Sequence, residues 1–202
     1  MKFFLVFGII FSMKLVIASN NDNKVRELKG LLCPYFDEIV SAKDMGFNAD
    51  IEENGQTFRE NAVIKARAVA RALGCAALAD DSGLCVDALC GRPGVMSSRY
   101  AGEHGNDMKN NLKLLKEMED IEERSCRFMC AVALAYPDGR CIVGEGSCEG
   151  VLLKDFKGNN GFGYDSLFYS RELGKSFGMA TEEEKGRVSH RFRAIDDLIS
   201  KL

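Results

Sequence analysis

The most constraining feature of this sequence is the apolar run 15–18, which leads directly into the polar segment 19–23. A short, continuous apolar run is typical of a strand buried on both faces, and the polar segment after it is typical of a turn. A helix is predicted over 24–32, because apolar residues recur there at helical spacing and Pro34 follows. The sequence therefore begins with a strand, a polar loop and a helix, as α/β folds do.

A second helix is marked by the segment 57–60, Thr-Phe-Arg-Glu, which has the pattern of a capping box. Apolar residues recur at helical spacing after it, and Gly74 ends the pattern. The residues that follow predict a short strand at 76–79, a turn at 80–83 and a further strand at 84–89. The turn, Asp-Asp-Ser-Gly, would place two adjacent carboxylates at a strand end.

The second half of the chain predicts a hairpin and two more helices. Strands are expected on either side of Pro137-Asp138-Gly139, within the segment 127–148. Three glycines in the segment 158–163 favour a loop with positive φ or close backbone approach. The helices are predicted from two apolar stripes, Met108, Leu112, Leu115 and Met118, and then Phe192, Ile195, Ile199 and Leu202. Strands that first alternate with helices and then pair as a hairpin predict an α/β fold with helices packed on a mixed sheet.

The composition limits what such a fold can bind. The 202 residues contain 27 Lys and Arg against 30 Asp and Glu, a net charge of −3, which excludes nucleic-acid binding through bulk positive charge. With 46% hydrophobic residues, the chain has enough apolar material for a core that needs no disulfide or structural metal. We therefore expect one large domain.

The cysteines point to a reducing compartment. The eight cysteines form no CxxC pair and the chain has only two histidines, so a structural zinc site is not expected. Cys90 and Cys130 stand among apolar residues, as free thiols do when they act as small core side chains. A disulfide framework would require an oxidising compartment. We predict reduced cysteines and a cytoplasmic protein.

The first twelve residues, MKFFLVFGIIFS, form a hydrophobic extension that bears on this location. Its apolar stretch has the length of a signal-peptide core and is too short to span a bilayer, so no membrane partner is expected. Cleavage after Ala18 would remove the predicted strand 15–18, which favours a chain that begins naturally at Met13. Residues 13–202 would then form the domain, and 1–12 would be an upstream mis-start or a short appendage. Export with cleavage is the alternative.

Polar residues gather where the predicted strands end, which is where ligands bind in α/β sheets. Ser19, Asn20 and Lys24 follow the first strand beside a helix start. They supply hydrogen-bonding groups and a cation, the components of an anion site. The alternative is an ordinary polar turn.

A second set of residues is suited to a metal ion beside a phosphate. Asp80 and Asp81 are adjacent carboxylates, which repel each other and need a cation near a protein core. With Glu52 and Glu53 they offer hard oxygen ligands of the kind that Mg²⁺ prefers. Lys65, like the lysine of the first loop, supplies positive charge for a polyphosphate beside the metal. The alternative is a solvated acidic turn and an acidic loop.

A third polar set lies nearer the C-terminus. An aromatic side chain in a glycine-opened loop stacks on a nucleobase, and charged side chains read its edge. Taken singly, the same residues fit a core Phe, a capping Ser and a His at a helix start. The set consists of Phe162, Gly163, Tyr164, Asp165, Lys185, Ser189, His190 and Arg191.

Three common motifs are excluded. Gly174-Lys175-Ser176 is not a P-loop, because Tyr169 stands where the first glycine is required. The glycines of 158–163 do not follow the dinucleotide-binding GxGxxG pattern, and the chain has no GxSxG nucleophile elbow.

Six blocks of sequence together resemble one known family. From Met13 to the C-terminus the chain is similar to the noncanonical purine nucleoside triphosphate pyrophosphatases, the inosine triphosphatase or dITP/XTP pyrophosphatase family. The order and spacing of the blocks are specific, whereas any single block would not be. The blocks are LVIASNNDNKVRE, GQTFRENAVIKARA, LADDSGLCVDALCGRPGVMSSRYAG, RFMCAVALA, GFGYDSLF and EEEKGRVSHRFRA.

The resemblance implies a fold and an activity. The fold would be α/β, a long mixed β-sheet flanked by helices, with two lobes around a nucleotide-binding cleft. The protein would be a homodimer that uses Mg²⁺ to hydrolyse ITP, dITP or XTP to the nucleoside monophosphate and pyrophosphate. This reaction would remove deaminated purines from the nucleotide pool.

The resemblance also implies roles for the site residues. The catalytic residues would be Asp81, Lys24 and Lys65, with Asp81 or its bound water as the base. Asp81 would bind Mg²⁺ with Glu52 or Glu53 and with Asp80. Ser82 would help to seat the substrate. The triphosphate would be held by Ser19, Asn20, Asn21, Asp22, Asn23, Lys24 and Lys65. The base pocket would consist of Phe162, Gly163, Tyr164, Asp165, Lys185, His190 and Arg191.

Two positions depart from the family pattern, which usually has Pro at the place of Ser166 and Ala at the place of Ser98. Both lie outside the charged set, so they affect loop rigidity more than chemistry. Two alternative functions remain, a non-catalytic nucleotide-binding protein and a related house-cleaning pyrophosphatase for other modified nucleotides. The complete acidic set argues against the first.

Overall fold

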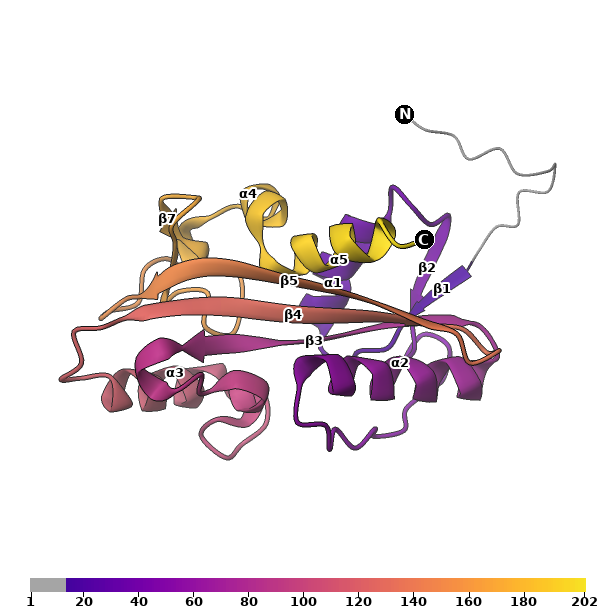
Figure 1. The fold of residues 1–202 in the computed structure, drawn as a ribbon, viewed down its shortest axis with the longest axis horizontal. Coiled ribbons are helices and arrows are strands. Elements are labelled where there is room, and N and C mark those ends of the chain that lie inside the picture. Colours follow the sequence, from indigo (N-terminus) through magenta and orange to yellow (C-terminus); the bar gives the residue numbers. More distant parts are fainter. Residues whose placement is uncertain (1–13) are drawn as a thin grey trace.

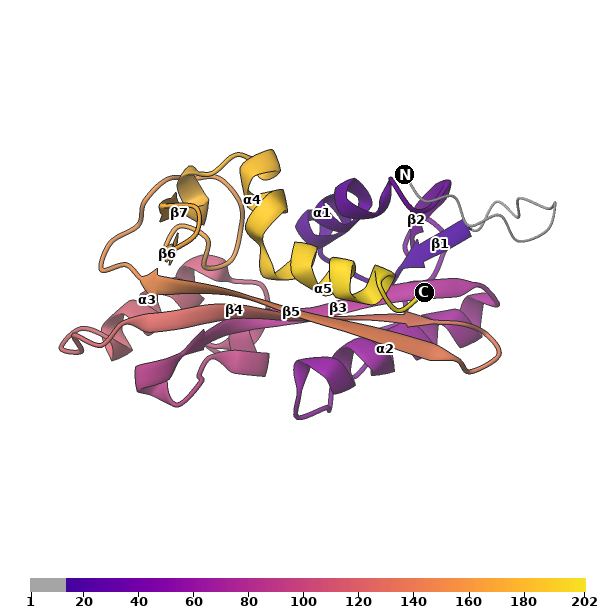
Figure 2. The same ribbon diagram turned by 45° about the horizontal axis from the view of Figure 1, so that its top comes forward.

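The computed structural model describes residues 14–202 and contains one seven-stranded mixed sheet (Figures 1 and 2). The strand order is β2 (Glu38–Ser41), β1 (Lys14–Ile17), β3 (Ala76–Val86), β4 (Ser125–Ala135), β5 (Cys141–Leu152), β6 (Phe168–Ser170) and β7 (Lys175–Ser176). β1 pairs in parallel with β2 and with β3, and the remaining neighbouring pairs in this order are antiparallel. The mixed sheet predicted from the sequence is confirmed.

Helices lie on both faces of this sheet. They are α1 (Asp22–Leu32), α2 (Phe58–Leu73), α3 (Asp107–Glu117), α4 (Glu182–Val188) and α5 (His190–Ile199). In Figure 1, α4 and α5 lie on one side of the long strands, α2 lies on the other, and α3 lies near the opposite end of these strands from α2. On β4, Val132 and Leu134 pack in the cluster that contains α5, whereas Ala131 and Ala133 pack in the cluster that contains the alanine-rich α2. Small residues on both surfaces thus let α2 approach the sheet closely.

The ends of the first two helices follow from their caps. Asn21 caps α1, because its side chain accepts hydrogen bonds from the backbone N–H groups of Asn23 and Lys24. The helix therefore begins at Asp22, earlier than the predicted 24–32. The capping box of α2 is confirmed, with Thr57 and Glu60 bonding to each other's backbone. Gly74 ends α2 in the left-handed region, at φ +64°.

The predicted turn at 80–83 is wrong, because β3 runs without interruption through these residues. Each residue of the segment pairs with β4, from Asp80 opposite Val132 to Gly83 opposite Met129. The acidic and small residues that mark a turn in the sequence here satisfy a ladder of antiparallel hydrogen bonds instead. The strand ends at Val86, so residues 84–86 of the predicted strand 84–89 continue β3, whereas Asp87–Leu89 form a short 3₁₀ helix and that part of the prediction is wrong.

The two predicted apolar stripes are confirmed only in part, since Leu115, Met118, Ile195 and Ile199 pack in or against the core and the other four residues do not. On α3, Met108 is 59% exposed and Leu112 is 52% exposed, while Asn111 and Leu114 are buried. Leu115 packs against the core and Met118 is fully buried, as predicted, so the stripe is right in its second half only. Polar side chains, Asn110 and Asn111, occupy part of the buried face in place of Met108 and Leu112. On α5 the buried face is His190, Arg191, Ala194, Ile195 and Leu198, whereas Phe192 is 36% exposed and Leu202 lies beyond the helix and is 58% exposed.

Other local predictions agree with the structure. β4 and β5 form the predicted hairpin around 137–139. The glycines at 158, 161 and 163 all have positive φ. All eight cysteines are free thiols, as expected, but Cys90 is exposed whereas Cys130 is buried.

Among residues 14–202, none of the helices combines the length and the apolar character that a membrane crossing requires. The predicted extension 1–12 lies outside the described residues and stays a prediction.

Candidate active site

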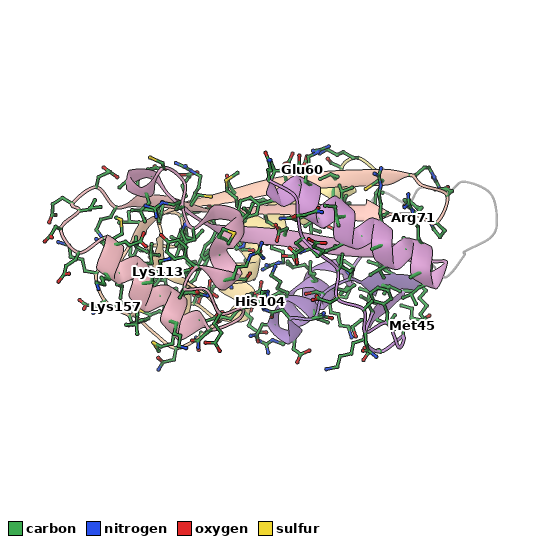
Figure 3. The ribbon with its side chains drawn as sticks, turned by 90° about the horizontal axis from the view of Figure 1, so that it is seen from below. Met45, Glu60, Arg71, His104, Lys113 and Lys157 are labelled. Carbon is green, nitrogen blue, oxygen red and sulfur yellow. The ribbon has the colours of Figure 1, made fainter. Side chains whose placement is uncertain are left out.

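A cavity of about 680 Å³ opens where β1, β3 and α2 meet the loop before β6, a volume in the range of small-molecule sites. Its wall takes polar residues from four parts of the chain: Ser19, Asn20, Asn21 and Lys24; Glu53 and Lys65; Asp81 and Ser82; and Phe162, Gly163 and Tyr164. A further part of the wall includes Ser98, one of the two departures from the family pattern, and Ser97, His104 and Asp107, which sequence analysis did not single out. Figure 3 shows His104 between Lys113 of α3 and the residues labelled on α2. The predicted phosphate, metal and base residues therefore meet in part at one cavity.

Asp81 is the most enclosed carboxylate in this wall. It is 7% exposed and points toward α2, where Asn61 donates a hydrogen bond to it over 3.1 Å and the Lys65 ammonium lies 3.4 Å away. Burial raises the pKa of Asp81 above its usual value, against the opposing effect of Lys65 and Lys24. A carboxylate with a raised pKa is suited to accept a proton. The sequence places Asn61 beside Lys65 on the polar edge of one helix, four residues apart, but sequence analysis gave Asn61 no role in the site.

Lys65 joins two carboxylates of the wall. Its Nζ lies 3.1 Å from Glu53 and 3.4 Å from Asp81, and the side chain is 12% exposed. Burial lowers the pKa of Lys65, but the charges of Asp81, Glu53 and Asp80 outweigh burial and raise it. The lysine is therefore held in its charged form beside the cavity.

Glu53 and Asp81 are the carboxylates placed to share a metal ion. Glu53 lines the cavity, whereas Glu52 is exposed and outside its wall. Among residues 14–202, no three His, Cys, Asp or Glu side chains come together as a complete metal site. Two carboxylates fit Mg²⁺ nonetheless, since this ion usually binds through one or two carboxylates, substrate phosphates and water.

Asp80 lies on the opposite face of β3 from Asp81, because side chains alternate along a strand. It is 1% exposed and contacts Arg191 over 2.9 Å and Lys24 over 3.4 Å. Burial raises the pKa of Asp80, but Lys24 and Arg191 outweigh burial and hold it well below the usual range. The structure therefore separates Asp80 from the predicted metal ligands Glu53 and Asp81.

A chain of buried ion pairs continues from Asp80 through α1 to the base-loop residues. Arg191 contacts both Asp80 and Glu27, and Lys185 contacts Glu27 over 2.7 Å and Asp165 over 2.6 Å. Burial raises the pKa of Glu27, but Arg191 and Lys185 outweigh burial and lower it. Sequence analysis did not single out Glu27. The feature that could have identified it is its position three residues after Lys24, which places both side chains on the same side of α1.

The predicted base pocket divides into a cavity wall and a buried support. Phe162, Gly163 and Tyr164 line the cavity, whereas the other four predicted residues are at most 6% exposed and lie outside the wall. Lys185 lies 4.9 Å from the centre of the Phe162 ring, and the Arg191 guanidinium lies 5.9 Å from it. The four buried residues are Asp165, Lys185, His190 and Arg191.

His190 is part of this support. It is 4% exposed and its ring stacks on Phe128 at 4.7 Å between centroids. Burial lowers the pKa of His190 well below its usual value, and the charges of Arg191 and Lys185 lower it further. The imidazole is therefore neutral at physiological pH.

The loop after β1 is only partly in the cavity. Ser19, Asn20 and Asn21 line it together with Lys24, whereas Asp22 and Asn23 lie outside its wall in the first turn of α1. Because the N–H groups of Asn23 and Lys24 are bonded to the Asn21 side chain, they are not free for an anion. Side chains of this loop, with the Lys24 ammonium, are then the groups that reach the cavity.

The whole chain, including the residues of this cavity, is similar to proteins of one known family. The profile of the Ham1 family matches residues 15–201. The dITP/XTP pyrophosphatase of Desulforamulus reducens is 49% identical over 185 residues, which cover 91% of this chain and 92% of that protein. The dITP/XTP pyrophosphatase of Bacillus licheniformis is 45% identical over 191 residues, which cover 94% and 97%.

Solved structures agree with the sequence comparison. The Ham1 protein of Staphylococcus aureus matches with a TM-score of 0.82 and 39% identity, over 93% of this chain and 97% of that one. A nucleoside-triphosphatase or dITP/XTP pyrophosphatase from Mycobacterium abscessus matches with a TM-score of 0.74 and 42% identity, over 93% and 99%.

Proposed function

This chain belongs to the Ham1 family, and from that membership we propose that it hydrolyses noncanonical purine nucleoside triphosphates to the monophosphate and pyrophosphate. The substrates would be dITP, ITP and XTP, so the reaction removes deaminated purines from the nucleotide pool. The observation that carries the proposal is the position of Asp81, enclosed between Asn61 and Lys65 in the wall of a cavity that also contains Lys24.

The triphosphate binds at the end of the cavity where the lysines lie. Lys24 and Lys65 come from two different helices and face the same space. Their ammonium groups neutralise the charge that develops on the phosphate oxygens in the transition state. Ser19, Asn20 and Ser82 supply hydrogen bonds that fix the register of the phosphates.

Mg²⁺ would be held by Asp81 and Glu53 together with substrate oxygens, and it would polarise the phosphates and make an attacking water more acidic. Asp81, which faces the cavity between Asn61 and Lys65, would accept the proton of that water. Attack at the α-phosphorus forms a new P–O bond to the water oxygen. The bond to the bridging oxygen breaks, and pyrophosphate leaves with that oxygen.

The base is selected by the loop 162–165 and the buried residues beside it. Hypoxanthine and xanthine have a 6-oxo acceptor, whereas adenine has a 6-amino donor. Lys185 and Arg191 flank the Phe162 ring from outside the cavity wall, and their charged groups are paired with carboxylates, so they support the loop and do not reach the base. A hydrogen-bond donor in the wall that faces the 6 position would match a 6-oxo purine and not adenine, and a buried mismatch of this kind discriminates by up to roughly 10⁴-fold.

We also propose a homodimer in the cytoplasm, with the cavity as the cleft between two lobes. Large apolar side chains that are more than one third exposed, among them Met96, Met108, Leu112 and Met179, are available for contact with a second copy. Sedimentation velocity should give twice the mass of one chain, and the mass of a single chain would contradict the dimer.

The assay that tests the function measures pyrophosphate release from ITP, dITP, XTP, GTP and ATP, with Mg²⁺ and with a chelator. We expect release from the first three, little from ATP, and none without the metal. Tight binding of ITP without release would favour the alternative of a non-catalytic binding protein. Release only from other modified nucleotides would favour the alternative house-cleaning pyrophosphatase.

A further inference from the structure

Two side chains on α3 hold the backbone of Gly163 from both of its polar groups. The Asp107 carboxylate accepts a hydrogen bond from the Gly163 N–H over 2.7 Å. The Asn111 amide donates a hydrogen bond to the Gly163 carbonyl over 2.8 Å. Because they are four residues apart, Asp107 and Asn111 lie on the same side of the helix. The pair therefore acts as a clamp on one residue of a loop that is more than fifty positions away in the sequence.

The clamped residue lies between the two aromatic residues of the cavity wall. Gly163 has φ +62°, a conformation that side-chain-bearing residues rarely adopt, and it separates Phe162 from Tyr164. The Tyr164 hydroxyl donates to the carbonyl of Ser97 over 2.9 Å. This is a third hydrogen bond that holds the loop, in addition to the two made by Asp107 and Asn111. The position of the Phe162 ring thus depends on contacts made by α3 and by the segment before it.

The other side of the same loop is fixed by a different support. The Phe162 N–H donates to Asp165 over 2.9 Å, and Asp165 pairs with Lys185 of α4. The phosphate-binding lysines, Lys24 and Lys65, are on α1 and α2 and make no contact with the α3 clamp. Loss of the clamp would therefore displace the aromatic loop without disturbing the phosphate end.

We propose that Asp107 and Asn111 are positioning residues that set the place of the Phe162 ring and thereby the base selectivity of the enzyme, an inference that rests on the proposed function. Stacking and hydrogen-bond selection require the ring and its neighbours to be held to within a fraction of an ångström. Asn111 is 4% exposed, and its Oδ1 has no hydrogen-bond partner within residues 14–202. The hydrogen bond that the Asn111 side chain makes is the one that its amide N–H donates to the Gly163 carbonyl.

The test compares Asp107→Ala and Asn111→Ala with the conservative Asp107→Asn, whose amide oxygen can still accept the Gly163 N–H. Leu114→Val is the control, because Leu114 is fully buried on the same helix and would loosen α3 without touching the clamp. For the alanine variants we expect kcat/KM for ITP to fall about tenfold or more, through KM more than kcat. The preference for ITP over ATP should shrink by a similar factor, while inhibition by pyrophosphate stays as in the wild type.

Asp107→Asn should restore most of the preference. Leu114→Val should lower the melting temperature and leave the preference intact. If the alanine variants keep the full preference for ITP over ATP, or if Leu114→Val loses it equally, the residues are structural only and the proposal is overturned.

A second measurement does not depend on activity. Hydrogen–deuterium exchange of the peptide 158–166 should be faster in Asp107→Ala than in the wild type, and unchanged in Leu114→Val, because the Gly163 N–H loses its acceptor. Unchanged exchange in Asp107→Ala would contradict the claim that Asp107 holds the Gly163 N–H, whether or not the variant is active. Failure of the wild type to release pyrophosphate from ITP would instead overturn the proposed function, while exchange would still decide whether the clamp exists.

Discussion

At the scale of single residues, the neighbours Asp80 and Asp81 have opposite electrostatic environments. Asp80 is surrounded by Lys24 and Arg191, which hold its pKa well below the usual range against burial. Burial raises the pKa of Asp81, since it prevails over the nearby lysines. Two identical side chains one residue apart therefore have pKa values that are shifted in opposite directions, because their surroundings differ.

We expect Asp81→Asn to abolish pyrophosphate release with little change in stability. The substitution removes a metal-binding charge and the proposed proton acceptor. The new amide can still accept the Asn61 hydrogen bond, and burial already disfavours the charge that is lost. The test measures release at saturating Mg²⁺ together with the urea midpoint, and near-normal turnover would contradict the role of Asp81.

Lys24→Ala and Lys65→Ala should each lower kcat/KM for ITP by a factor on the order of 10². Lys65→Ala should also lower the free energy of unfolding, by about 3 kcal/mol, because it leaves Asp81 and Glu53 without their shared cation. Lys24→Ala should cost less, since Asp80 keeps Arg191. Lys29→Ala, also on α1, is the matched control and should behave nearly as wild type, because the Lys29 side chain is 41% exposed and its Nζ lies 3.9 Å from the Asp44 carboxylate. A variant with wild-type kinetics would show that its lysine does not reach the phosphates.

His190 should make stability depend on pH in the mildly acidic range. Burial lowers the pKa of His190 well below the usual value. As the pH falls below about 6.5, the imidazole is therefore protonated in the unfolded chain but stays neutral in the folded chain. Stability is therefore fully present above about pH 6.5 and falls as the pH decreases, by about 1.4 kcal/mol per pH unit while the folded imidazole stays neutral.

The measurement is the free energy of unfolding between pH 7.5 and 5 for the wild type and for His190→Phe, which keeps a ring against Phe128. Glu27 and Asp80 have lowered pKa values, so the stability that they contribute is lost only at more acidic pH. The difference between the two curves isolates His190, and parallel curves would refute the prediction.

At the scale of elements, α5 rests directly on the backbone of β5. A Cβ at Gly144 would overlap the carbonyl oxygen of Ala194 and the backbone nitrogen of Leu198, both in α5. Glycine is required here by close approach and not by φ. Since α5 begins with His190 and Arg191, this contact also fixes the distance of Arg191 from the sheet, and thereby its position beside the Phe162 ring.

Gly144→Ala should therefore lower the free energy of unfolding by about 1–3 kcal/mol, because α5 must move away from the sheet. Gly30→Ala is the matched control: it lies within α1 with no atom within 4 Å of the added Cβ, and it should stabilise the protein by about 0.5–1 kcal/mol. Urea denaturation of both variants tests the pair, and changes of the same sign would contradict this account of α5 packing.

At the scale of the whole molecule, the cavity lies where β1, β3 and α2 meet the loop before β6. Its wall comes from segments as far apart as Ser19 and Tyr164, and from both sides of β3. No fragment of the chain carries all of these residues. The site should therefore be lost in one cooperative unfolding transition with the sheet.

A chain that begins at Met13 should fold and act as the full chain does. β1 begins at Lys14, and the Ham1 profile matches from residue 15, so the elements that build the cavity are all retained. Equal values of kcat/KM and of the urea midpoint for both chains are the expected result. A chain from Met13 that is insoluble or inactive would show that the segment 1–12 belongs to the functional unit.

Local patterns in the sequence were sufficient for much of the fold. The capping box at Thr57 and Glu60, the stop at Gly74 and the hairpin turn at 137–139 are decided by neighbouring residues, through backbone hydrogen bonds and allowed φ. The apolar run 15–18 and the helix after it could be predicted for the same reason. The motif blocks also pointed to Asp81, Lys24 and Lys65, which the structure brings to one cavity, while their catalytic roles stay predictions.

Only the tertiary structure decided which residues face each other. Asp80 and Asp81 were predicted to share a turn, but pairing with β4 extends the strand and sends the two carboxylates to opposite faces. The roles of Glu27 and Asn111 depend on partners more than fifty residues away, Arg191 and Gly163, and no local pattern contains that information. Burial, which sets the pKa values of Asp81 and His190, is likewise a property of the packed chain, because it is the surrounding elements that remove water from these groups.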